Sequence, residues 1–111
     1  MAKKLTTEEK IRESLLGQLR AQNKWIDYYL DLVSTYMLHW RLKEELSKDI
    51  KENGLRVTVT SGNGFATEKP NTSIADLQRE TTIMLQILDK MDLRTPVLSS
   101  QESESDGDGY L

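Results

Sequence analysis

Few side chains in this sequence could carry acid–base or metal chemistry. His39 is the only histidine and cysteine is absent, so a zinc site lacks a second histidine or cysteine ligand, and no base lies nearby in sequence to build a nucleophile–histidine triad. A carboxylate cluster between residues 44 and 52 alternates with lysines, which is typical of a solvated helix face with ion pairs. We therefore expect a packed or interfacial His39, no metal, no cofactor and no enzymatic activity.

Basic side chains are the other group that could bind a ligand, and they concentrate at the start of the chain. Residues 1–24 hold six basic and three acidic side chains, whereas the whole chain, with 15 basic and 18 acidic residues, has a net charge of −3. Such a segment can neutralise phosphates, a contribution to nucleic-acid affinity that is independent of sequence and weakens with salt. The candidate DNA-contacting residues are Lys3, Lys4, Lys10, Arg12, Arg20 and Lys24.

Negative charge concentrates in residues 99–111, which contain four acidic and no basic side chains. Serines and glycines fill most of the remaining positions, so the segment cannot bury enough apolar area to offset the entropy of ordering. We predict a disordered acidic tail. Tyr110 and Leu111 follow its acidic residues, and they are either a frayed end or a docking tip for another protein.

The size of the chain limits what it can form alone. Its 111 residues, 37% of them hydrophobic, allow one small domain with a tail. A core of this size stabilises by only a few kcal/mol, roughly, so a partner or oligomerisation is expected to contribute. No apolar run approaches the ~20 residues needed to cross a bilayer, and the start has no signal-peptide core. We expect a soluble cytoplasmic protein with no membrane partner.

Two helices are predicted before residue 54. Thr6 and Glu9 have the spacing of a capping box, and a single apolar arc follows until a break near Asn23. The segment from residue 25 to 52 contains no Pro or Gly, and Asn53-Gly54 supplies a helix end. The apolar arc of this long helix starts at Trp25 and rotates partway along. This is expected when a helix meets two partners, of which one can be the first helix and the other a neighbouring copy of the protein.

A hairpin and a third helix are predicted after residue 54. Residues 55–60 alternate apolar and polar side chains, residues 61–64 form a turn around Asn63-Gly64, and residues 65–69 return. Because a lone two-stranded ribbon is marginal in water, it must lie on the helices or on another subunit. Pro70 ends the ribbon, and the third helix follows until about residue 92.

These elements predict a mainly α fold in the order helix, long helix, β-hairpin, helix and disordered acidic tail, within an oligomeric assembly. Residues 1–24 form a basic N-terminal helical segment, residues 25–98 a helical and hairpin oligomerisation core, and residues 99–111 the tail. The candidate oligomer interface combines part of the long helix with the hairpin, and its residues are Tyr36, His39, Trp40, Leu42, Leu46, Ile50, Val57, Val59 and Phe65.

The order of motifs from Trp25 to Leu98 resembles the small-subunit family of bacteriophage terminases, of the short, hairpin-carrying type. The motifs are Ile50-Lys51-Glu52-Asn53-Gly54-Leu55, alternating strand residues, Gly62-Asn63-Gly64, Lys69-Pro70-Asn71 opening a helix, and Met91-Asp92-Leu93-Arg94-Thr95-Pro96 closing it. Family members likewise have a long helix ending in Gly, a glycine-tipped hairpin and a proline-containing stop. Two positions depart from the family, in which Asn-Pro is commoner than Pro70-Asn71 and Gly is usual in place of Asp92.

The resemblance implies a non-enzymatic protein that binds double-stranded viral DNA in the host bacterial cytoplasm and presents it to the large terminase subunit, an ATPase and nuclease. It also implies a homo-oligomeric ring. Tyr110 and Leu111 are then candidates for docking to the large subunit. The main alternative is a small dimeric helical DNA-binding regulator, such as an antitoxin or transcription factor, and a third class is an adaptor that binds only protein.

Overall fold

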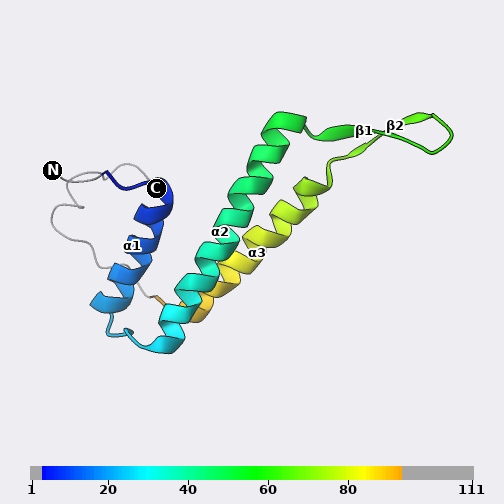
Figure 1. The fold of residues 1–111 in the computed structure, drawn as a ribbon. Helices are drawn as coiled ribbons and strands as arrows, with labels where there is room; N and C mark the ends of the chain where they lie inside the picture. Colours follow the sequence, from blue (N-terminus) through cyan, green and yellow to red (C-terminus); the bar gives the residue numbers. More distant parts are fainter. Residues whose placement is uncertain (1–3, 94–111) are drawn as a thin grey trace.

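The computed structural model describes residues 4–93, which form three helices and a two-stranded antiparallel sheet. Figure 1 shows α2 and α3 side by side, with α1 beside the first half of α2 and the hairpin projecting from the far end of the pair. The predicted mainly helical fold with one hairpin is confirmed; the predicted tail lies outside the described residues. The elements are α1 (Thr7–Ala21), α2 (Asp27–Asn53), β1 (Arg56–Thr60), β2 (Ala66–Pro70) and α3 (Thr72–Met91).

The first helix begins with the predicted capping box. The Thr6 side chain accepts a hydrogen bond from the Glu9 N–H at 3.1 Å, and the Glu9 carboxylate accepts one from the Thr6 N–H at 2.9 Å. These bonds satisfy two of the backbone donors that a helix start leaves free. The predicted break is also confirmed, because Asn23 has a left-handed φ of 61°, a conformation that Asn tolerates better than most residues.

The long helix α2 starts two residues later than predicted. Ile26 is extended and serves as the N-cap, so Trp25 and Ile26 belong to the loop that reverses the chain between α1 and α2. At its other end, the Gly54 N–H donates to the Ile50 carbonyl oxygen at 2.7 Å, and Gly54 has a φ of 83°. With 27 residues, α2 extends for about 40 Å.

The hairpin has the predicted antiparallel pairing, with Val57 opposite Lys69 and Val59 opposite Thr67. Each strand begins one residue later than predicted. Among the strand residues Val57 alone is half-buried and all others are exposed. The ribbon was predicted to lie either on the helices of its own chain or on another subunit. Its own helices leave it largely exposed, so they are not its support.

The core lies where all three helices meet, at the end of the molecule opposite the hairpin. Its buried residues are Leu19 of α1, Val33 and Met37 of α2, and Ile87 and Met91 of α3. The other half of α2 packs mainly on α3, which leaves it more open to solvent. None of the three helices in residues 4–93 combines the length and apolar composition needed to cross a membrane.

Candidate functional site

The basic residues of α1 and its flanks are placed unevenly. Lys4, Lys10 and Arg20 are exposed, whereas Arg12 is half-buried and lines a groove between α1 and α2; Lys3 lies outside the described residues. Arg41 of α2 lines the same groove and forms an ion pair with Glu8 of α1. Sequence reasoning missed Arg41 here, because the contact joins residues that are 33 positions apart.

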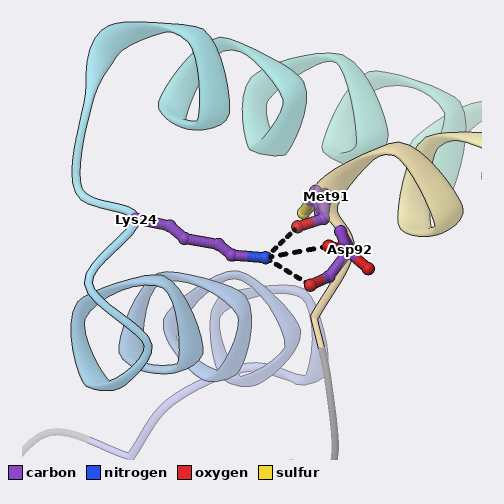
Figure 2. A network of polar contacts seen from close by, with 3 residues as sticks. All are labelled: Lys24, Met91 and Asp92. Carbon is purple, nitrogen blue, oxygen red and sulfur yellow. Dashed lines mark hydrogen bonds and ion pairs between the residues drawn. The ribbon is translucent and has the colours of Figure 1, made fainter.

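Lys24 was predicted to be a DNA-contacting cation, but its ammonium is bound by the end of α3 (Figure 2). It donates to the Met91 carbonyl oxygen at 3.0 Å and to the Asp92 carbonyl oxygen, and the Asp92 carboxylate lies 3.8 Å away. The last carbonyls of a helix lack intrahelical partners and carry partial negative charge, so they attract a cation. The Lys24 side chain is only 17% exposed. It caps the C-terminal end of α3 and is not part of the free basic surface.

The hairpin carries an apolar face that is largely exposed. Alternation along the strands places Val57 and Val59 on one side, and Leu55 and Phe65 extend the same alternation at the two ends. Leu55 is 67% exposed and Phe65 69% exposed. We call Leu55, Val57, Val59 and Phe65 the hairpin apolar face.

A polar junction fixes the base of the hairpin to the helices. The Asn71 side chain, buried to 5% exposure, donates to the Asp49 carboxylate and to the Gly54 carbonyl oxygen, both at 3.0 Å. The Ser73 hydroxyl also donates to Asp49, at 2.7 Å, as does the Asn53 amide. Asp49 is therefore an acceptor at the junction and not, as predicted, one more member of a solvated charged face. Hydrogen bonds from Ser73, then Asn71 and Asn53, lower its pKa.

Three of the predicted interface residues of α2 contact their own chain. The imidazole of His39 is paired with the carboxylate of Glu80 on α3, and both side chains are largely covered. Tyr36 and Trp40 pack against the core cluster, and burial raises the pKa of the Tyr36 phenol. Farther along α2, Leu42 is exposed while Leu46 and Ile50 are half-buried.

An aromatic patch lies at the loop between α1 and α2. Trp25, Ile26 and Tyr28 are 44%, 56% and 57% exposed, and the Arg20 guanidinium lies 4.3 Å from the centre of the Trp25 ring. The sequence pattern assigned Trp25 to the buried arc of α2. That assignment is wrong, because Trp25 precedes the first helical turn and so does not follow the helical period. Arg20, Trp25, Ile26 and Tyr28 are hereafter the aromatic patch.

Neither a metal site nor a similarity to known proteins adds a residue to these surfaces. Within residues 4–93, no group of three or more acidic or histidine side chains is arranged to hold a metal ion. Comparisons with protein-family models, curated proteins and solved structures find no match to this chain. Three surfaces of the described residues are candidates for function. They are the exposed basic residues Lys4, Lys10 and Arg20, hereafter the basic side of α1, together with the hairpin apolar face and the aromatic patch.

Proposed function

We propose that this chain is a small terminase subunit that binds double-stranded viral DNA in the host bacterial cytoplasm and recruits or regulates the large ATPase/nuclease subunit during genome packaging. In this proposal it is not an enzyme and acts as a homo-oligomeric ring. The order of motifs from residue 25 to 98 supports the proposal. The single observation that carries it is the uncovered hairpin apolar face, since this face favours assembly with other copies.

Assembly would compensate for the small amount of apolar surface that one copy buries. A two-stranded hairpin is marginally stable in water unless its apolar face packs against something. Complete burial of a Leu or Phe side chain contributes about 1.5–3 kcal/mol, and Leu55 and Phe65 are both more than half exposed. A hairpin that packs on a different surface of the next copy forms a head-to-tail contact, which closes into a ring when the rotation allows.

The basic side of α1 would supply DNA affinity through repetition. Each copy presents exposed Lys4, Lys10 and Arg20, and a small number of cations gives weak, salt-dependent attraction to phosphates. When several copies are joined, binding at one copy raises the effective concentration of DNA at the next. A ring could therefore bind duplex DNA well although each chain binds weakly.

Light scattering coupled to size exclusion tests the assembly part of this proposal. We expect the mass of several chains at micromolar protein concentration, and Phe65→Ser should lower that mass because it removes the largest side chain of the hairpin apolar face. Leu85→Ser is the matched control, since Leu85 is also highly exposed, at 62%, but lies on α3 away from the hairpin. The mass of a single chain for the unaltered protein would contradict the proposal.

The same measurement, combined with DNA binding, separates the proposal from its rivals. A compact dimer that protects a palindromic DNA site would support the dimeric regulator instead. An assembly without salt-dependent affinity for duplex DNA would support an adaptor that binds only protein.

A further inference from the structure

The aromatic patch has the composition of a binding surface. Trp, Tyr and Arg dominate the residues that carry binding energy at protein interfaces. Here Trp25 is exposed beneath the Arg20 guanidinium, and Tyr28, three residues later in the chain, is also exposed. Apolar residues scattered singly over a surface need no explanation, whereas exposed apolar side chains that gather in one place and are rimmed by polar residues are typical of interaction sites. No other described element of the chain covers this patch.

The patch lies beside the point from which the C-terminal segment continues. Lys24, next to Trp25, binds the carbonyl oxygens of Met91 and Asp92 at the end of α3 (Figure 2). Leu93, the last described residue, packs against the core cluster that contains Leu19. Leu93 therefore follows directly on residues that contact Lys24, and Lys24 is the neighbour of Trp25 in the aromatic patch.

The sequence beyond residue 93 matches this patch in chemistry and in length. It contains an acidic run, Glu102, Glu104, Asp106 and Asp108, followed by the apolar pair Tyr110 and Leu111. Seventeen peptide steps separate Leu93 from Tyr110, which allows a maximum span of about 58 Å. A tether of this kind gives millimolar effective concentrations, so even a weak contact would be populated.

We propose that residues 99–111 dock on the aromatic patch of their own chain, with Tyr110 and Leu111 against Trp25 and Ile26. The acidic run then lies along the basic side of α1, near Arg20, because Asp27 and Asp92 disfavour a path over the start of α2. Docking hides the apolar pair and Arg20 together, and release exposes both. This inference depends on the described patch and the charge pattern, and it holds whether or not the chain is a terminase subunit.

Fluorine NMR of the full chain labelled with 5-fluorotryptophan tests the proposal. The chain has two tryptophans, and Trp25→Phe assigns the two resonances. We expect the double variant Tyr110→Ser, Leu111→Ser to shift the Trp25 resonance at low salt and to leave the Trp40 resonance unchanged, because Trp40 packs against the core. Ser103→Ala, Ser105→Ala is the matched control within the same segment and should shift neither.

Two further arms separate the proposed occupant from others. High salt should move the Trp25 resonance toward its position in the Tyr110→Ser, Leu111→Ser variant, since it weakens the attraction to the acidic run. An unchanged Trp25 resonance in that variant would overturn the proposal. So would a Trp25 resonance that responds only to protein concentration or to added duplex DNA, because the patch would then be covered by a second copy or by nucleic acid.

Discussion

Lys24 and Met91, 67 positions apart in the sequence, are joined by a hydrogen bond from the Lys24 ammonium to the Met91 carbonyl oxygen at 3.0 Å (Figure 2). This hydrogen bond ties the loop between α1 and α2 to the end of α3. Met91 and Leu19 of α1 are the two completely buried side chains of the core, and the Lys24 backbone N–H donates to the Leu19 carbonyl oxygen at 2.8 Å. One lysine therefore connects all three helices where the core is most enclosed.

Replacing Lys24 by Met should lower the free energy of unfolding by about 1–3 kcal/mol. The variant keeps the apolar stem but leaves the last carbonyls of α3 without their cationic donor, and such charged hydrogen bonds contribute in this range. The ion pair with Asp92 adds little, because that carboxylate is 71% exposed. Urea denaturation followed by circular dichroism measures the change.

The matched control for Lys24 is Lys10→Met. Lys10 is exposed on α1, and exposed substitutions of this kind usually change stability by less than about 0.5 kcal/mol. Equal effects of the two substitutions would show that the hydrogen bonds of Lys24 to α3 do not stabilise the chain.

The elements of the fold were predictable because their signals are local. The capping box of Thr6 and Glu9, the Gly54 stop and the Asn63-Gly64 turn each act within a few residues. The main error concerned the start of α2, where no side chain caps the helix and no local pattern marks the boundary. The predicted helix therefore included Trp25 in its apolar arc, although the structure places it in an exposed loop.

The surfaces were less predictable because long-range contacts decide which side chains remain free. Charge alone put Lys24 in the DNA-binding set, but α3 returns to it after a separation of 67 positions. The sequence pattern placed Asp49 on a solvated charged face. In the structure the hairpin returns the chain to α2, and the Asn71 amide donates a hydrogen bond to the Asp49 carboxylate. In each case the partner is fixed by the topology and not by neighbouring sequence.

The polar junction predicts a specific pH dependence of stability. Hydrogen bonds from Ser73, Asn71 and Asn53 lower the pKa of Asp49 in the folded chain. A lowered folded-state pKa means that the stabilisation is complete above the ordinary Asp pKa of about 4 and is lost as the pH falls through the lower, folded-state value. Asp49→Asn should therefore reduce the loss of stability between about pH 5 and pH 2.

The measurement is the slope of the unfolding free energy against pH, and not its absolute value, because Asp49→Asn also removes an acceptor from Asn71. Asp31→Asn, an exposed position on α2, is the control and should leave the slope closer to that of the unaltered chain. A slope unchanged by Asp49→Asn would show that the junction does not hold the carboxylate in its charged form.

The proposed DNA surface predicts a change in salt dependence. Lys10→Glu, Arg20→Glu should weaken binding to duplex DNA at low salt and reduce the slope of log affinity against log salt, which falls by about 0.9 for each phosphate that the protein no longer neutralises. Both side chains are exposed, and Lys24 is left unaltered because α3 engages it. Fluorescence anisotropy with labelled DNA measures the slope.

The control for the DNA surface is Lys90→Glu, which changes an exposed charge on α3. It should leave both the affinity and the slope closer to those of the unaltered chain. Light scattering must give the same mass for all variants, so that weaker DNA binding is not a consequence of disrupted assembly. Equal affinities for the α1 variant and the unaltered chain would exclude this surface.

Gly54, which ends α2, and Gly17, within α1, predict opposite changes in stability on substitution by Ala. Gly54 combines a φ of 83° with a ψ of −175°, a region that is essentially restricted to Gly, so Gly54→Ala should cost about 1–3 kcal/mol. Gly17 lies within α1, and a Cβ there would meet nothing within 4 Å; Gly17→Ala should therefore stabilise by about 0.5–1 kcal/mol. Thermal unfolding measures both, with Gly62→Ala as the turn control, since Gly62 does not have a positive φ.

The Gly54 carbonyl oxygen also accepts the Asn71 hydrogen bond at the base of the hairpin. Gly54→Ala should therefore lower the mass of the assembly measured by light scattering. A destabilised variant with an unchanged mass would show that assembly does not depend on the direction of the hairpin.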